Sequence, residues 1–282
     1  MATVIGYPIV NAGVKYINGL NLVHVDDENI TVKSGSCRDS TNKDDIILSA
    51  DANCDILTNG IGGLDTGSVA ASTFYAVHIV ASSLSANPVT DIQQQRLYTG
   101  SGAFTIQSTP SSDVSNNPQP GIMFSLSATA PTLPLNYDMF RRIGYVLTDG
   151  SSDILAFWQT GGGADRTMWY DALITELSGG TSATFAAIDL ATSVPVAALG
   201  GTSTDVIFNI ALTPTGADDT MALRPTGSAS VAGFVIMGGD AAGVVHTDQI
   251  TCPCAISASV AKVDYLVTGA VTISTAGYVD KL

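Results

Sequence analysis

The chain has 282 residues, of which 45% are hydrophobic and only 13% are charged, and its formal net charge is −14. This length and apolar fraction allow a hydrophobic core in one or two domains and exclude a disordered chain. The negative charge argues against nucleic acid and anionic membrane as partners, because both are themselves negative. No apolar run approaches the roughly 18 residues of a membrane helix, so membrane insertion is not expected.

The composition favours strands over helices. Nearly all acidic residues are aspartates, and only Glu28 and Glu176 are glutamates. Asp favours turns and caps, whereas Glu is a good helix former. Because the chain also holds 28 Gly and 11 Pro, no window of helix length is favourable. We therefore predict an all-β protein with little helix, built from two antiparallel β-domains.

Residues 1–160 are predicted to form an N-terminal β-rich module. Its clearest strand is TFYAVHIVA at residues 73–81, which is apolar on both faces, as in a strand that lies between two layers. A polar connection is predicted at 33–45, and a hairpin at 91–108. Shorter strands are predicted at 30–32, 46–48 and 122–126.

The stretch FRRIGYVLTDGSSDILAFWQ, residues 140–159, predicts a further hairpin that closes this module. An Asp-Gly step between two apolar β-type runs is a strong hairpin signal, because Gly accepts positive φ without steric cost. Three glycines follow at 161–163. We therefore expect a flexible linker over residues 161–180.

Residues 181–282 are predicted to form a second domain. Short strands at regular spacing, separated by turn signals, are typical of a β-sandwich or jelly roll. The predicted strands are 181–190, 194–199, 205–213, 221–224, 231–237, 244–251, 260–267 and 271–279.

Motifs for catalysis are not found in the sequence. There is no G-x-S-x-G elbow, and the only histidines are His24, His78 and His246. His78 lies among apolar residues of the predicted strand 73–81, so we interpret it as a core histidine. Glycoside hydrolysis would need two placed carboxylates, and no pair can be identified among the many aspartates. We predict no catalytic residues and no enzymatic activity.

One loop carries oxygen ligands of the kind that Ca²⁺ takes, at Asp39, Asn42, Asp44 and Asp45. Their spacing does not match an EF-hand, and Asp/Asn clusters are common loop chemistry. We favour a solvated acidic turn, and predict no metal and no cofactor. The four cysteines are predicted to be buried or unreactive, because a C-x-C pair with a proline inside does not fit a zinc site.

Five residues near the glycines are candidates for an interface between domains or subunits. Trp158, Trp169 and Tyr170 could stack on sugar, but aromatic rings more often contribute to interface burial. Arg141 and Arg142 form the only adjacent basic pair in the chain, and they could form ion pairs with nearby aspartates within or between subunits.

Three stretches resemble the shared module of structural proteins from tailed bacteriophages, including tail fibre proteins. They are TVKSGSCRDSTNKDDIILS (31–49), NGIGGLDTGSVAASTFYAVHIV (59–80) and SATAPTLPLNYDMFRRIGYVLTDGSSDILAFW (127–158). The second half, from ALRPTGS (222–228) to VTISTAGYVDKL (271–282), resembles the β-domain that often accompanies this module. Residues 91–119 look like an insertion relative to the shared module of these phage proteins.

The resemblance implies a homotrimer without a cofactor, in a role of structure or host attachment, and it supplies no catalytic residues. We interpret the chain as a trimeric tail fibre or tail-appendage subunit of a virion, assembled in the host cytoplasm and released by lysis. Expected partners are copies of itself, other virion proteins and a host surface glycan or receptor. A capsid decoration or head-fibre protein is the main alternative, and a polysaccharide-degrading spike is less favoured.

Overall fold

A computed structural model of the chain describes residues 16–82, 119–195, 203–229, 235–238, 241–257 and 260–282. These ranges contain strands and no helix, which confirms the all-β fold class. The strands are β1 (Ile17–Gly19), β2 (Leu22–His24), β3 (Asn29–Val32), β4 (Gly35–Arg38), β5 (Asp45–Leu48), β6 (Ala52–Asp55), β7 (Phe74–Ala81), β8 (Gly121–Ser125), β9 (Met139–Leu147), β10 (Phe157–Thr160), β11 (Asp165–Gly180), β12 (Ala186–Asp189), β13 (Ser203–Thr213), β14 (Thr220–Pro225), β15 (Val235–Gly238), β16 (His246–Ser257), β17 (Val260–Val267) and β18 (Ala270–Lys281).

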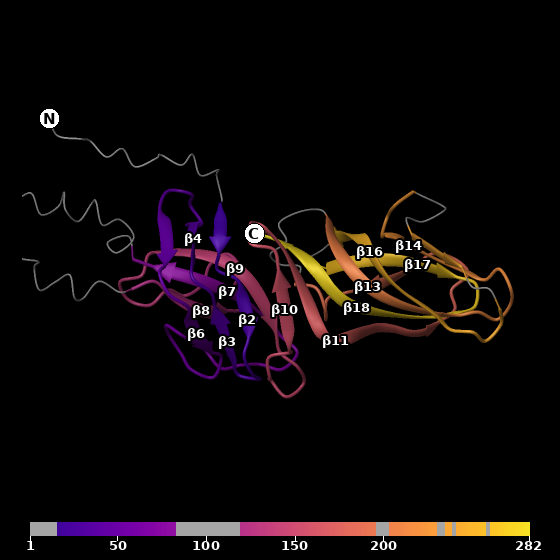
Figure 1. The fold of residues 1–282 in the computed structure, drawn as a ribbon, viewed down its shortest axis with the longest axis horizontal. Helices are drawn as coiled ribbons and strands as arrows, with labels where there is room; N and C mark the ends of the chain where they lie inside the picture. Colours follow the sequence, from indigo (N-terminus) through magenta and orange to yellow (C-terminus); the bar gives the residue numbers. More distant parts are fainter. Residues whose placement is uncertain (1–15, 83–118, 196–202, 230–234, 239–240, 258–259) are drawn as a thin grey trace, which may run out of the picture.

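The strands form three sheets, and every pairing between named strands is antiparallel. Two sheets have three strands each, in the orders β1-β4-β5 and β8-β7-β9. The third has 12 strands in the order β15-β14-β17-β16-β13-β18-β11-β10-β2-β3-β6, with β12 paired to β17. In Figure 1 the small sheets lie at one end of an elongated molecule, and β10, β11 and β18 lie between them and strands β12–β17.

The C-terminal strands enclose a core of their own. β17 pairs with β16 over residues 260–262, with β12 over residues 262–265 and with β14 over residues 263–267. Alternate residues of β13 point inward, as its sequence pattern predicts. The core includes Phe208, Ile210, Leu223 and Val263, all fully buried. This arrangement is consistent with the predicted β-sandwich.

The N-terminal strands are organised around β7, which lies in the middle of the β8-β7-β9 sheet. Its residues from Tyr75 onward are all buried, which confirms the strand predicted at 73–81. The polar segment 33–45, predicted as an exposed connection, instead contains β4, which pairs with β1 and β5 through a buried Cys37. The hairpin predicted at 91–108 lies outside the described residues.

The hairpin predicted over residues 140–159 is confirmed only near its turn. The turn exists, because the Ser152 amide donates to the Asp149 carbonyl over 3.2 Å. Next to the turn, the arms are joined by the bridge between Thr148 and Ile154 and by the Leu155 amide, which donates to the Leu147 carbonyl over 2.9 Å. Beyond these residues the two arms separate. β9 pairs with β7, whereas β10 pairs with β11 and β2. Burial of Phe157 in the large sheet favours these distant partners over the local one.

The segment 161–180 is not the linker that its glycines suggest. From Asp165 onward it forms β11, a strand of 16 residues that pairs with β10 on one side and β18 on the other. The inward residues Arg166, Met168 and Tyr170 are buried, and this burial fixes the segment as a strand. Through β11 the large sheet joins β2, β3 and β6 of the first half to the strands of the second half.

A buried ion pair connects β9 to β18. The guanidinium of Arg142 donates two hydrogen bonds to the Asp280 carboxylate, of 2.8 and 2.7 Å, and a third, of 3.1 Å, to the Lys281 carbonyl. The Arg142 side chain is 10% exposed and that of Asp280 is fully buried. Both carboxylate bonds come from the Nη1 atom of Arg142, and the bond to Lys281 comes from Nη2. Charge-assisted bonds of this kind are among the strong hydrogen bonds in proteins. They tie the last strand to the β8-β7-β9 sheet.

Arg166 lies beside this pair, because its register partner in β18 is Asp280. Its side chain is fully buried. Its guanidinium bridges the β1–β2 turn, β9, β10 and the glycine segment. The acceptors are the carbonyls of Gly19, Leu20, Ile143 and Gly163 and the side-chain oxygen of Gln159. Burial lowers the pKa of Arg166 to about 10, with Asp280 opposing the shift, so the group stays charged at neutral pH.

We predict that Asp280→Asn destabilises the fold by about 3–5 kcal/mol, because it leaves the buried charge of Arg142 without its partner. The matched control is Asp51→Asn, which removes the exposed pair between Lys33 and Asp51, of 2.8 Å. That change is expected to cost at most about 1 kcal/mol. Equilibrium urea unfolding measures both, and equal midpoints for the two variants would contradict the prediction.

Candidate functional site

An exposed pair of tryptophans lies in the middle of the large sheet. Trp158 on β10 and Trp169 on β11 are register partners, and their rings are parallel to within 6°, with centroids 5.9 Å apart. Trp158 is 47% exposed. Trp169 is partly buried, and its indole nitrogen donates to the Thr160 hydroxyl over 3.4 Å. Side chains alternate along a strand, so burial of Phe157 on one face presents Trp158 on the other.

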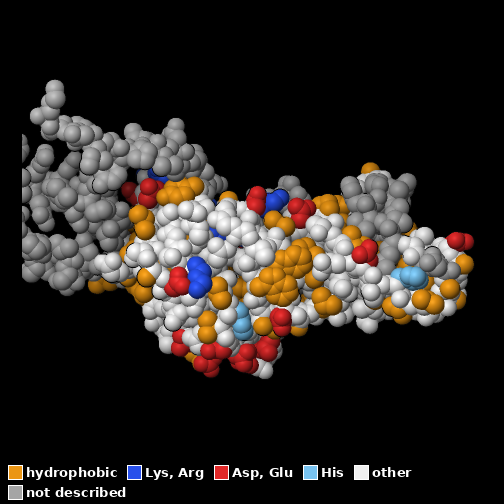
Figure 2. Space-filling view, viewed as in Figure 1, with side chains coloured by type: hydrophobic (Ala, Val, Ile, Leu, Met, Phe, Trp, Pro, Cys, Tyr) orange, Lys and Arg blue, Asp and Glu red, His pale blue; other side chains and the backbone are white. Residues whose placement is uncertain are grey.

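The tryptophan pair belongs to a row of residues that runs across five strands. The register places Ile207, Gly277, Trp169, Trp158 and Val23 side by side, from β13 to β2. A Cβ atom at Gly277 would lie 2.2 Å from a backbone oxygen of β11, so only glycine fits there. Figure 2 shows a hydrophobic patch in the middle of the molecule, with acidic side chains near two of its edges.

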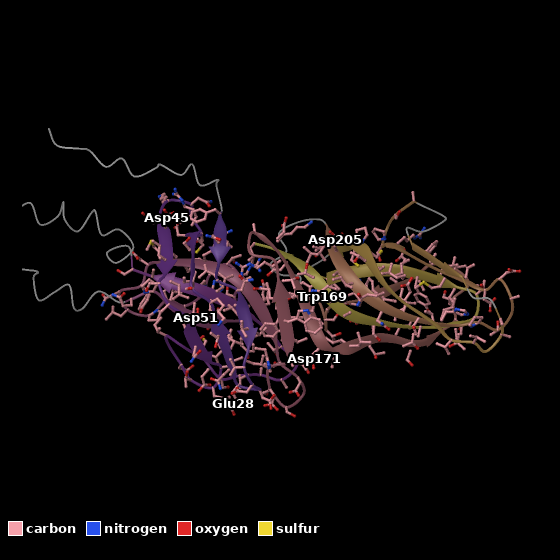
Figure 3. The ribbon with its side chains drawn as sticks, in the orientation of Figure 1. Glu28, Asp45, Asp51, Trp169, Asp171 and Asp205 are labelled. Carbon is pink, nitrogen blue, oxygen red and sulfur yellow. The ribbon has the colours of Figure 1, made fainter. Side chains whose placement is uncertain are left out.

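Polar groups lie along the same face of the sheet as the tryptophan pair. Beyond Val23 the row continues with Thr31, whose hydroxyl donates to the Asn53 side chain over 2.7 Å. Asp171, two residues after Trp169 on β11, is exposed. In Figure 3, Asp171 and Asp205 lie on opposite sides of Trp169. The site therefore combines two parallel aromatic rings with hydroxyl, amide and carboxylate groups.

The other interface candidates lie inside the chain. Tyr170 is 7% exposed and its hydroxyl donates to the Ser193 carbonyl over 2.6 Å. Burial raises the pKa of Tyr170 well above its ordinary value. Arg142 forms an ion pair with Asp280, which lies far from it in the sequence. The side chain of Arg141 is buried, because this residue is 8% exposed. Of the five candidates, only the two tryptophans offer substantial surface.

The candidate metal loop is held closed by its own hydrogen bonds. The Asp39 carboxylate accepts the amides of Thr41, Lys43 and Asp44. Burial alone would raise the pKa of Asp39, but these hydrogen bonds hold it below its usual value. Asp45 points elsewhere and forms an ion pair with Arg38 over 2.9 Å. The loop is therefore an Asp-capped turn, with Asn42 in a left-handed conformation (φ 57°).

The cysteines of this chain are buried thiols. All four cysteines are buried and free, as predicted. Burial raises the pKa of Cys37 and of Cys252 to about 12. In the part of the chain that the structure describes, no three His, Cys, Asp or Glu residues are grouped so as to hold a metal ion. Within the same residues, no helix is long and apolar enough to cross a membrane.

A polar network inside the second half was not predicted from the sequence. The Thr275 hydroxyl donates to the Glu176 carboxylate over 2.8 Å, and the Ser193 hydroxyl donates to Thr275 over 3.1 Å. Burial raises the pKa of Glu176, although hydrogen bonds from neighbouring hydroxyls oppose the rise. The one sequence signal for this network is that Glu176 is one of only two glutamates in the chain. The network joins β11 and β18 to the segment after β12.

His78 is buried in the β8-β7-β9 sheet, which confirms the prediction of a core histidine. Its Nε2 atom lies 2.9 Å from the Ser127 carbonyl, and its Nδ1 atom has no hydrogen-bond partner. Burial lowers the pKa of His78 to about 4. The ring is therefore neutral in the folded protein at physiological pH.

No protein-family model matches the chain, and no curated protein matches it either. Two solved structures from infectious bursal disease virus are similar to it, one of the Gx strain and one of the VP2 subviral particle. Each is 11% identical to this chain in sequence, with a TM-score of 0.18. Each match covers 95% of this chain, and it covers 66% of the first viral chain and 67% of the second. Scores this low establish neither a shared fold nor a function.

We predict that stability falls as the pH is lowered from 6.5 towards 4, in part through His78. Below pH 6.5 the unfolded chain binds a proton at this histidine that the folded chain excludes until about pH 4. The difference amounts to about 3 kcal/mol at pH 4. Urea unfolding at several pH values measures it, and His78→Gln should show a shallower loss. Identical pH dependence in the variant and the original protein would contradict the prediction.

Proposed function

We propose that this protein is a structural subunit of a bacteriophage virion, a homotrimeric tail fibre or tail appendage that contributes to host attachment. The sequence resemblance of residues 31–158 and 222–282 suggests the class of protein. The observation that supports a structural role most directly is the single sheet that joins both halves of the chain. A continuous sheet keeps the two ends in a fixed relation, as an appendage requires.

The surface chemistry also supports a structural role. Only 13% of the residues are charged, and small or hydroxyl-bearing residues take their place. Such a surface can pack against copies of itself, because little charge has to be removed from water on assembly. The core histidine His78 is buried and neutral, and its Nε2 atom contacts the Ser127 carbonyl. We therefore propose a non-enzymatic protein whose partners are virion proteins and a host surface molecule.

We predict that the protein is found in purified phage particles in tens of copies, located at the tail. Quantitative mass spectrometry of the particles gives the copy number, and labelling with a specific antibody in electron microscopy gives the location. Hundreds of copies on the shell would instead support a capsid decoration protein. Absence from the particles would overturn the proposal.

We also predict a stable homotrimer in solution. Multi-angle light scattering of the purified full chain should give three times the mass of the 28.9 kDa subunit. A stable monomer at micromolar concentration would contradict the trimer without excluding a place in the virion.

A further inference from the structure

We propose that Trp158 and Trp169 form a binding platform for a neutral glycan. The inference rests on the proposed role in host attachment and adds the site and the chemical class of the ligand. The two rings are stacked on each other, parallel to within 6° with centroids 5.9 Å apart, on two neighbouring strands, and Trp158 is 47% exposed.

The chemistry of the site matches the two kinds of surface on a sugar ring. The face of an indole is electron-rich, so it attracts the C–H groups on the apolar face of a pyranose. The hydroxyl groups around the edge of the sugar need hydrogen-bond partners. Thr31, Asn53 and the exposed Asp171 provide such groups near the tryptophan pair. An oligosaccharide can contact the exposed Trp158 and these polar groups together, so it should bind more tightly than a monosaccharide.

The area of the tryptophan pair alone is smaller than a stable protein interface. A complete aromatic side chain can bury roughly 150–250 Å². With Trp158 about half exposed and Trp169 less so, the pair offers on the order of 200 Å². A stable protein interface needs roughly 800 Å² on each partner. A sugar needs only the area of its own ring, so the tryptophan pair is of the right size for a glycan.

The charge of the surroundings selects among glycans. The whole chain carries a formal charge of −14, and Asp171 and Asp205 lie near Trp169 in the view of Figure 3. Negative charge repels nucleic acid and acidic polysaccharides. A neutral glycan has no such cost, and its hydroxyls can donate to the carboxylates. The ligand class is therefore a neutral oligosaccharide.

The chain allows a direct test, because Trp158 and Trp169 are its only two tryptophans. Any change in tryptophan fluorescence therefore reports on this site. The full-length protein is titrated with maltohexaose, chitohexaose and a mannose hexasaccharide, with heparin as the anionic control. We expect a saturable change with at least one neutral hexasaccharide and none with heparin. Absence of a saturable change with all three neutral probes would overturn the inference.

Variants separate stacking from unspecific effects. Measured by calorimetry, Trp158→Ala should weaken binding by about tenfold, the loss expected for one aromatic stacking contact, whereas Trp158→Phe should weaken it less. Leu135→Ala is the control, because Leu135 is 88% exposed and lies outside the row of the site. Urea unfolding checks that all three variants fold. Equal affinity of Trp158→Ala and the original protein would overturn the inference.

Two further outcomes keep this inference separate from the proposed function. If fluorescence changes with protein concentration alone and the chain self-associates through Trp158, the pair is a subunit contact and the glycan site is wrong. If the protein is present in purified virions but binds no glycan, the proposed function stands and this inference fails. If the protein is absent from virions, the proposed function fails, and the titration still decides the glycan site.

Discussion

Three buried charges hold the two halves of this protein together. Arg142 and Asp280 satisfy each other across 138 residues of chain, and Arg166 satisfies backbone carbonyls from several segments. Burial raises the pKa of Asp280, while the two arginines oppose that rise. Each group would be costly to bury alone, so the cluster favours only the arrangement in which all three meet. The position of the last strand depends on this arrangement.

The same strands that carry these charges present the tryptophan pair. Along β11 the odd and even residues point to opposite faces, so that Arg166 enters the core and Trp169 reaches the surface. Their register partners on β18 are Asp280 and Gly277, which lie on those same two faces. Any slip of β11 by one residue would bury the tryptophan and expose the arginine. The buried charges therefore fix the register that the surface site needs.

The sequence predicts what is local and misses what is distant. The all-β class, β7 and β13 follow from composition and alternation, and His78 follows from its apolar neighbours. The partners of β10 and of Arg142 depend on strands far along the chain, which no local pattern reveals. The glycines at 161–163 conceal β11, because a flexible turn and a linker share one signal. Of the candidate site, the aromatic residues could be predicted, but their register partnership could not.

A binding site on strands differs from one on loops in the conformational entropy that is lost when a ligand binds. Both indoles are held by a regular ladder on two neighbouring strands, so little conformational entropy remains to be lost when a ligand stacks on them. The close approach at Gly277 leaves no room for a side chain beside Trp169. Such a site can bind weakly at each copy and still act strongly when several copies are joined, because linked sites raise the effective concentration. In the proposed homotrimer, three tryptophan pairs held in this way would suit attachment to a surface that presents many identical sugars.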